Sequence, residues 1–310
     1  MLKKAFFVLR TQVFARIYID TNTDYRHSIL LSSLGRSGST LISNLINYKN
    51  DYRIIFEPFK YDTVPLAKPF VHPFYVSPAN RDELLLKSLD AIVSGKIRTA
   101  WTDKDNKKFI AKERLIKDIR VNLLLNWIRE IYTELPIILL IRNPFTVIES
   151  WMRAGWPADR PQKRILEQES LISPLLPKGV FELFKSAITP LEKYLYTWCI
   201  NYYIPLQKAK ENNYHITFYE NYFLSPESET EALFKYLGKP FDVKALKQLN
   251  HFSRTTSKDS PVRKGGNVLQ LWKTKFSTSE IEQGAAILSR FGFDKLYNLH
   301  DSGLSMINYK

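Results

Sequence analysis

Hydrophobic residues along the chain fall into two kinds of pattern. Four short, mostly apolar runs are typical of buried strands, at residues 28–34, 52–56, 135–141 and 215–219. Between and after them, apolar side chains recur at helical spacing, which predicts helices over 81–94, 121–132, 227–237 and 278–291 and over most of 180–212. Strands separated by helices favour an α/β fold, with a central parallel sheet covered by helices on both faces.

Three segments show other patterns. Residues 96–111 predict a β-hairpin with its turn at Asp105-Asn106, and residues 157–178 predict loops. Residues 58–78 contain five prolines, which predicts a long ordered loop of the kind that often covers a substrate site.

The first residues form a pattern of their own. Apolar side chains recur at roughly helical spacing in residues 1–19, and every charged side chain before Asp20 is basic. We expect residues 1–26 to form an N-terminal basic amphipathic segment and residues 27–310 to form a single domain. Such a segment could lie on a membrane surface, dock on its own domain or pack against a second subunit.

Composition narrows the class of protein. The 310 residues are 45% hydrophobic, which is enough apolar surface for a folded core and excludes a disordered chain. The single cysteine, Cys199, excludes an intramolecular disulfide, and the longest unbroken apolar run is far shorter than the roughly 20 residues that span a bilayer. We expect a cytoplasmic protein, with residues 1–19 as a candidate contact with the inner face of the membrane.

The net charge of +14 indicates an anionic partner. The basic residues are scattered among acidic ones rather than gathered in a stripe, which argues against nucleic acid as that partner.

The run at 28–34 leads into Gly35, Arg36, Ser37, Gly38, Ser39 and Thr40, and a helical pattern follows. A strand, a glycine-containing turn and a helix together make a phosphate-binding unit, because turn N–H groups and the positive helix end face the anion. No Lys precedes Ser39, although nucleoside triphosphate-binding loops place one there on the outer phosphates. The loop is therefore expected to bind anions with protein cations rather than through a metal ion.

A second anion-binding candidate follows the run at 135–141. Arg142 stands at the carboxyl end of this predicted strand, where open α/β sheets bind ligands. Pro144 can open the next helix, and Thr146 and Ser150 then share one helix face. Arg142 and a hydroxyl from this helix can converge on one phosphate. The alternative is an Arg that pairs with a carboxylate.

Together, GRSGSTLISNLI and LLIRNPFTVIES resemble the two cofactor-binding motifs of sulfotransferases. Glu57-Pro58 and the Lys117 to Arg120 stretch are similar to segments of the carbohydrate sulfotransferases, and HITFYENYF resembles a further family segment. The resemblance runs from about residue 27 to about residue 297. It implies the sulfotransferase fold, a P-loop-like parallel sheet, and the cofactor 3′-phosphoadenosine 5′-phosphosulfate (PAPS), which leaves as 3′-phosphoadenosine 5′-phosphate (PAP).

The resemblance also implies roles for individual residues. The 5′-phosphosulfate would be held by Arg36, Ser37, Gly38, Ser39 and Thr40. The 3′-phosphate would be held by Arg142 and Ser150, with Arg263, Lys264 and Gly265 closing over it, and Tyr219 would lie near the adenine. Leu41 stands where small-molecule members carry a Trp, so another aromatic ring would have to stack on the adenine.

Glu57 and Arg36 are the expected catalytic residues. Arg36 would stabilise charge on the leaving oxygen, and Glu57 would accept the proton of the acceptor hydroxyl. We expect burial to raise the pKa of Glu57. His72 is the second candidate base, and Glu57 could instead be a structural partner of Arg36 or Arg120.

The Glu-Pro pair with Lys117 and Arg120 favours a sugar hydroxyl as acceptor, on a glycan or a lipid-linked sugar. The alternatives are a P-loop nucleotide kinase or NTPase and a non-catalytic protein that binds an anionic polymer. A kinase or NTPase is disfavoured for two reasons. The turn lacks the phosphate-binding Lys, and the strand that ends at Arg142 is not followed by the Asp that would hold magnesium.

Overall fold

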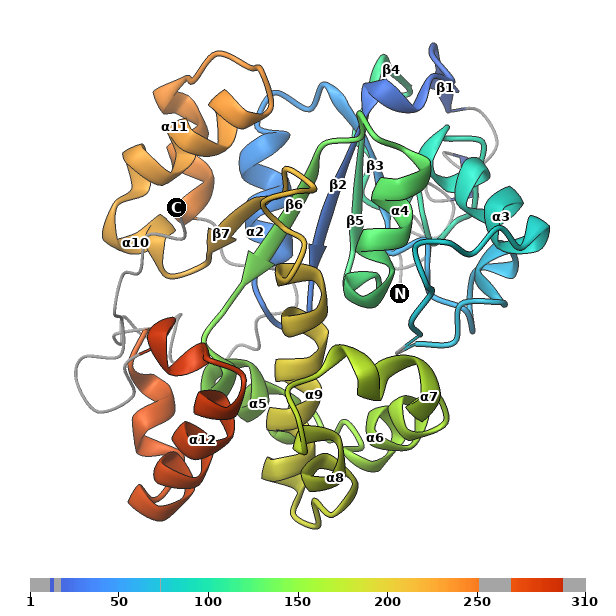
Figure 1. Ribbon diagram of the computed structural model, residues 1–310. Helices are drawn as coiled ribbons and strands as arrows, with labels where there is room; N and C mark the ends of the chain where they lie inside the picture. Colours follow the sequence, from blue (N-terminus) through green and yellow to red (C-terminus); the bar gives the residue numbers. More distant parts are fainter. Residues whose placement is uncertain (1–11, 14–17, 73, 251–268, 298–310) are drawn as a thin grey trace, which may run out of the picture.

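The computed structural model describes residues 12–13, 18–72, 74–250 and 269–297. Five parallel strands form its central sheet (Figure 1). Their order across the sheet is β3 (Tyr52–Phe56), β5 (Glu113–Asp118), β2 (Ser28–Ser33), β6 (Ile137–Ile141) and β7 (His215–Phe218). A small parallel pair, β1 (Ile19–Asp20) with β4 (Ile110–Ala111), lies beyond the amino-terminal ends of the central strands.

Alternate residues of the central strands point to opposite faces, and each face has its own apolar core. Leu30, Ile116 and Leu139 join a large cluster with helices α3, α4 and α9. Leu31 and Leu140 join a smaller cluster with α2 and α11. Helices therefore cover both faces, which confirms the predicted α/β fold and explains why these strands read as continuous apolar runs.

The helices connect the strands and extend past the carboxyl end of the sheet, where α5, α6, α8, α9 and α12 gather (Figure 1). Their bounds are α2 Ser39–Ile46, α3 Glu83–Val93, α4 Leu125–Ile131, α5 Pro144–Arg153, α6 Asp159–Leu166, α7 Glu169–Ile172, α8 Val180–Lys185, α9 Pro190–Leu206, α10 Asn221–Leu224, α11 Pro226–Tyr236 and α12 Thr278–Arg290. Short 3₁₀ helices cover Tyr25–His27, Pro65–Ala67, Asn122–Leu124, Ser173–Leu175, Val243–Asn250, Leu271–Thr274 and Phe293–Lys295.

Two predicted elements were wrong. Residues 96–111 form no hairpin, because Asn106 pairs through its side-chain amide with the backbone of Ile54 and fixes a loop along the edge strand β3. Residues 157–178, expected to be loops, contain α6 and α7. Ile165 and Ile172 on these helices are buried, so their packing against the core accounts for the helical structure.

The central strand β5 has no counterpart in the sequence prediction. Its sequence, ERLIKD, carries four charged residues, although Arg114, Lys117 and Asp118 are buried. Each of these charged groups has a partner, which is what permits its burial.

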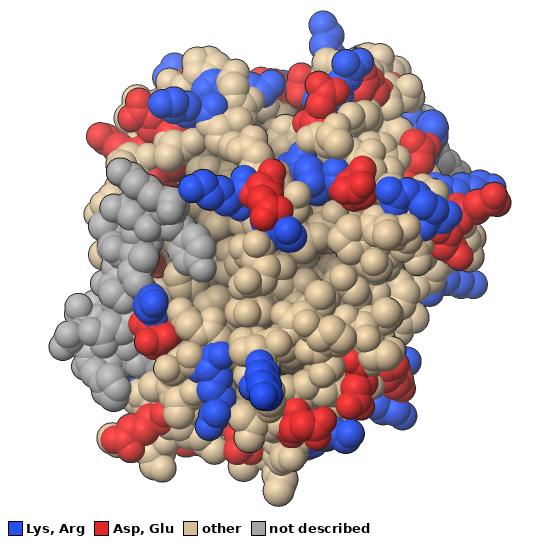
Figure 2. Space-filling view, in the orientation of Figure 1, with Lys and Arg blue, Asp and Glu red and all other residues tan. Residues whose placement is uncertain are grey.

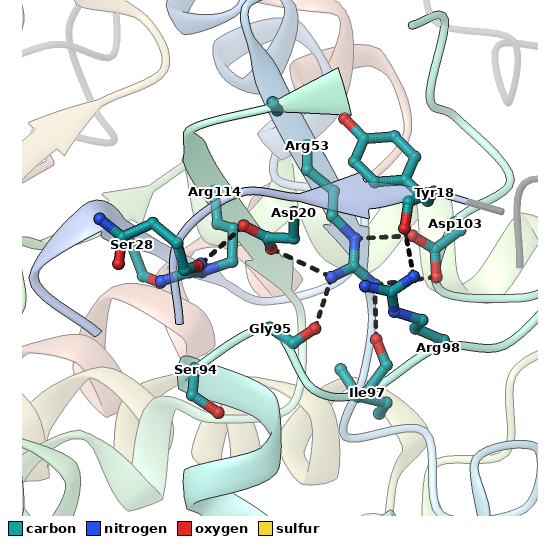
Figure 3. A network of polar contacts seen from close by, with 12 residues as sticks. Tyr18, Asp20, Ser28, Arg53, Ser94, Gly95, Ile97, Arg98, Asp103 and Arg114 are labelled. Carbon is teal, nitrogen blue, oxygen red and sulfur yellow. Dashed lines mark hydrogen bonds and ion pairs between the residues drawn. The ribbon is translucent and has the colours of Figure 1, made fainter. Parts of the chain in front are cut away.

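A buried ion network closes the amino-terminal end of the sheet (Figure 3). Arg53 on β3 contacts Asp103 at 2.8 Å and Asp20 at 3.2 Å, and Arg114 on β5 contacts the same Asp20 at 2.9 Å. Both guanidinium groups are fully buried. Asp20 therefore ties β1 to the central sheet, so the described part of the predicted N-terminal segment packs as part of the domain.

The described residues of the proline-rich stretch, 58–72 and 74–78, pack inward. Phe59, Val64, Ala67 and Phe70 are buried in the larger core. No helix within the described ranges is both long and apolar enough to cross a bilayer. Most of the basic amphipathic stretch 1–19 lies outside those ranges.

Candidate anion-binding and catalytic site

The glycine-containing turn between β2 and α2 has a tightly defined shape. Arg36 and Gly38 both have positive φ angles, of 72° and 91°. A Cβ atom at Gly38 would lie 2.2 Å from the ring of Tyr219, so only glycine fits there. The turn therefore brings its backbone close to Tyr219 and points the first N–H groups of α2 out of the carboxyl end of the sheet.

Two aromatic side chains that sequence reasoning missed hold this turn. The Tyr202 hydroxyl, on α9, accepts from the N–H of Leu34, donates to the carbonyl of Leu140 and lies 3.4 Å from Ser37 Oγ. Trp151 Nε1 donates to the carbonyl of Gly35 at 2.9 Å. Because both rings lie inside apolar helical stretches, no sequence pattern distinguishes them from ordinary core residues.

The two predicted anion-binding motifs meet through Arg36. Its Nε donates to Ser150 Oγ at 2.7 Å, and Arg142 donates to the Arg36 carbonyl at 2.9 Å. The Arg142 guanidinium carbon also lies 4.1 Å from the centre of the Tyr219 ring, which fixes the arginine by a cation–π contact. The sequence predicted that Arg142 and a helix hydroxyl converge; in the structure Arg36, which was expected at the 5′-phosphosulfate, contacts both Arg142 and Ser150.

This cluster fits an anionic oxygen. Arg142 Nε is buried and has no hydrogen-bond partner within the described part of the chain. Burial lowers the pKa of Arg36, and the like charges of Arg153 and Arg142 lower it further. Two neighbouring arginines, one of them with an Nε that is unpaired within the described residues, offer donors for an anion such as a phosphate.

The other predicted cofactor residues fall into three sets. Ser37, Gly38, Ser39 and Thr40 lie in the turn or the first turn of α2, as expected. Tyr219 is buried between Gly38 and Arg142, so it positions both, and its proximity to an adenine stays a prediction. Arg263, Lys264 and Gly265 lie outside the described residues.

Glu57 stands at the carboxyl end of β3, two strands away from the turn. Its φ of 42° is uncommon for a residue with a side chain and marks local strain. Lys117 donates to its Oε1 and Arg120 to its Oε2, each at 2.9 Å. Ile119 lies between Lys117 and Arg120 in the chain. Its side chain would lie 3.2 Å from a Cβ atom at Gly35, so the segment that carries both cations borders the turn.

The prediction that Glu57 has a raised pKa was wrong. Burial does favour the neutral carboxyl group, but the adjacent charges of Lys117 and Arg120 and their hydrogen bonds outweigh it and hold the pKa below its usual value. Glu57 is therefore ionised at neutral pH. The alternative role, a partner of Arg120, is what the structure displays.

His72 and Asp118 surround the same corner. His72 Nδ1 lies 3.1 Å from the Arg120 carbonyl, and burial, with the charge of Arg120, lowers its pKa to about 3. Asp118 accepts from the N–H groups of Phe59 and Arg120 at 2.8 Å, and burial raises its pKa to about 6. Asp118 therefore fixes the loops that carry Glu57 and Arg120, a role that no sequence pattern indicated.

Within the described ranges, no cluster of three or more His, Cys, Asp or Glu residues could hold a metal ion. Asn143, which follows Arg142, caps α5 by accepting from the N–H of Thr146. The chemistry that the described groups offer is thus anion binding by arginines, turn N–H groups and hydroxyls, next to an ionised carboxylate.

Comparison with known proteins places the chain in a family. The sulfotransferase domain model matches residues 26–285, so the chain belongs to the sulfotransferase domain family. This confirms the resemblance drawn from the two motifs, and with it a PAPS-dependent sulfotransferase as the class of enzyme. The comparison with curated proteins gave no match.

Solved structures with similar folds have low sequence identity. The sulfotransferase domain of the curacin biosynthetic pathway is 16% identical, with a TM-score of 0.47, covering 88% of this chain and 98% of that one. Retinol dehydratase in complex with androsterone and PAP is 14% identical, with a TM-score of 0.42, covering 92% and 84%. Sulfotransferase STF9 from Mycobacterium avium is 9% identical, with a TM-score of 0.42, covering 86% and 76%.

Proposed function

We propose that the protein transfers a sulfuryl group from PAPS to a hydroxyl of a carbohydrate or glycolipid. The observation that carries this proposal is the meeting of Arg36, Arg142 and Ser150 beside the glycine turn, with Arg142 Nε lacking a partner within the described residues. These three residues would hold the 3′-phosphate, and the turn with the start of α2 would hold the 5′-phosphosulfate.

When bound, PAPS would supply the sulfuryl group, as a bond from the acceptor oxygen to sulfur forms and the bond from sulfur to the 5′-phosphate oxygen breaks. Glu57 would take the proton of the acceptor hydroxyl, because its carboxylate is ionised and borders the turn through Ile119. Backbone N–H groups of the turn would stabilise the negative charge left on the 5′-phosphate.

Arg36 needs a modified role. Its guanidinium lies against Ser150, on the Arg142 side of the turn rather than beside Glu57. In this arrangement Arg36 would help to hold the 3′-phosphate. Backbone N–H groups of the turn would be the first groups to stabilise the charge on the leaving oxygen. A role for Arg36 at the leaving oxygen stays a prediction.

A sugar hydroxyl as acceptor is supported by Glu57-Pro58 and by the cations that pair with Glu57, both of which resemble carbohydrate sulfotransferases. We also propose a cytoplasmic enzyme whose residues 1–19 contact the membrane surface. Loss of vesicle binding on deletion of these residues would support this contact, and unchanged partitioning to anionic vesicles would contradict it.

The test is a transfer screen with PAPS that carries labelled sulfate. Glycans and lipid-linked sugars form one set of acceptors, and phenols and steroids form the other. Label on a sugar-containing acceptor, lost in Arg142→Ala, is the expected result. Label only on phenols or steroids would contradict the proposed acceptor class and leave sulfuryl transfer intact. PAP binding with no transfer to any acceptor would indicate a non-catalytic binding protein.

A further inference from the structure

A group of lysines and aromatic rings lies at the end of the edge strand β3, next to Glu57. Phe56 ends β3 just before Glu57, and Trp101 packs edge-on against it with 5.3 Å between ring centres. Trp101 also donates to the Glu57 carbonyl at 3.2 Å. The loop that carries Trp101 is fixed, because the Thr102 carbonyl accepts from the N–H of Phe56 at 2.8 Å.

Lys104 reaches both rings. Its Nζ lies 3.6 Å from the centre of Phe56 and 3.5 Å from the centre of Trp101. Two further ammonium groups are close by, since Lys117 Nζ lies 4.5 Å from the centre of Phe56 and Lys60 Nζ lies 5.1 Å from that of Trp101. Three lysines therefore converge on two rings at the expected acceptor side of Glu57.

The three lysines differ in their partners. Lys117 pairs with Glu57, and Lys60 pairs with Asp62 at 2.5 Å. Lys104 makes no ion pair with any carboxylate of the described residues, although it is half-buried. Burial lowers the pKa of Lys104 and the two neighbouring lysines act in the same direction, whereas the carboxylates of Asp105 and Glu57 oppose them. Two aromatic rings hold this ammonium group without an ion-pair partner among the described residues, which leaves it able to pair with an anion of a ligand.

We infer that Lys104, with Trp101 and Phe56, forms a subsite for an anionic substituent of the acceptor. The inference rests on the proposed function, because the acceptor hydroxyl must lie at Glu57. Aromatic rings would contact the sugar ring while Lys104 pairs with a phosphate or carboxylate attached to it. Both a uronic acid and a sugar phosphate supply this chemistry.

The test follows Lys104 directly by NMR, after its amine and the other lysine amines are dimethylated with ¹³C, which preserves the charge. Lys104→Arg identifies the Lys104 signal by its disappearance. In PAP-saturated protein, we expect glucuronate or glucose 1-phosphate to shift this signal saturably, whereas glucose should not. Whichever anion binds more tightly identifies the source of the charge.

Lys210 is the matched control, because it is exposed and precedes β7 at the opposite end of the sheet. Its signal should not respond saturably. A Lys104 signal that shifts only linearly, or in step with Lys210, while PAP still binds would overturn the subsite and leave the proposed function standing. Failure of PAP itself to bind would overturn the proposed function, and the subsite with it.

A second measurement uses turnover on any acceptor pair that differs only in the anionic group. The preference for the charged acceptor, as a ratio of kcat/KM values, should fall about tenfold or more in Lys104→Gln, the scale of one lost charge-assisted contact. Lys104→Arg should recover part of this preference, and Lys210→Gln should keep all of it. An unchanged ratio in Lys104→Gln would overturn the subsite.

Discussion

Arg36 Nε donates to Ser150 Oγ at 2.7 Å and so joins the turn after β2 to helix α5. This contact brings together two motifs that are more than 100 residues apart in the sequence. Arg142 completes the join through the Arg36 carbonyl and keeps its own Nε unpaired within the described residues. These contacts hold Arg36 and Arg142 in place beside the turn, where the proposed 3′-phosphate site needs oriented donors.

Arg142→Ala should weaken PAP binding by about 1.5–3 kcal/mol, or roughly 10- to 100-fold, because a charged hydrogen bond to the 3′-phosphate is lost. Isothermal titration calorimetry measures this change. Adenosine 5′-phosphate, which lacks the 3′-phosphate, serves as the control ligand and should lose much less affinity. An equal loss for both nucleotides would mean that Arg142 does not contact the 3′-phosphate.

Gly38→Ala should impair the turn, because the new Cβ would meet the Tyr219 ring at 2.2 Å in a backbone conformation with φ of 91°. We expect PAP affinity to fall about tenfold or more and stability to fall by about 1–3 kcal/mol. Gly155→Ala is a matched control, since Gly155 also has a positive φ but nothing within 4 Å of a Cβ. It should lose some stability and retain PAP binding. Similar behaviour of the two variants would exclude the Tyr219 contact as the cause.

Glu57→Gln should abolish sulfuryl transfer and leave PAP binding nearly unchanged, since the proposed base pairs with Lys117 and Arg120 rather than with the arginine cluster. Calorimetry with PAP and transfer of labelled sulfate give the two readings. Glu113→Gln is the matched control, because Glu113 begins β5 at the far end of the sheet. Near-normal transfer in Glu57→Gln would place the base elsewhere.

The low pKa of Glu57 predicts the pH dependence of transfer. Because the pKa of Glu57 lies below its usual value, this base stays ionised from neutral pH down to about pH 5. The value of kcat/KM should therefore be nearly constant over that range. A base with a pKa near 7 would instead cause a loss of rate below neutrality. A loss of rate below neutral pH, with PAP affinity unchanged over the same pH range, would contradict the ionised state of Glu57.

The pKa of Asp118 is shifted in the opposite direction from that of Glu57, so Asp118 should contribute to stability mainly at low pH. Its pKa is raised to about 6 in the folded protein, so between about pH 4 and 6 the folded state holds a proton that the unfolded state has released. The contribution of Asp118 to stability is therefore largest at low pH and declines as pH rises through 6. Denaturant unfolding of the wild type and Asp118→Asn should give a stability difference that falls across this window. A constant difference would contradict the raised pKa.

Sequence patterns predicted the parts of the fold that depend on continuous apolar runs. Strands β2, β3 and β6 were predicted because apolar side chains on both of their faces are buried, and β7 packs Ile216 and Phe218 against the larger cluster. Strand β5 was not, because Arg114 and Lys117 interrupt its pattern. These two residues are buried through partners from other segments, Asp20 and Glu57, which only the folded structure brings near.

In the candidate site too, some features follow from local sequence patterns and others depend on contacts that only the fold creates. Local motifs were enough to predict that Arg142 and Ser150 lie close together, since one stands at a strand end and the other on the adjoining helix, but not that Arg36 contacts both. The pKa of Glu57 depends on the balance between burial and two nearby cations, so the sequence alone gave the wrong direction. Tyr202 contacts Leu34 and Lys104 contacts Phe56, each in a distant segment, and no local pattern encodes such contacts.

Charges of both signs are interspersed on the face shown in Figure 2, which offers no single basic surface for a polyanion. This favours a small anionic ligand, held by a few arginines, over nucleic acid as the reason for the positive net charge.

Binding of PAP to the full chain, measured by calorimetry without metal and compared with ATP plus Mg²⁺, tests the central claim most directly. The arginine cluster at Ser150 predicts that PAP binds at least about tenfold more tightly than ATP with Mg²⁺, the scale of one charged contact to the 3′-phosphate. Tighter binding of ATP with Mg²⁺, or no binding of PAP, would contradict a PAPS-dependent sulfotransferase.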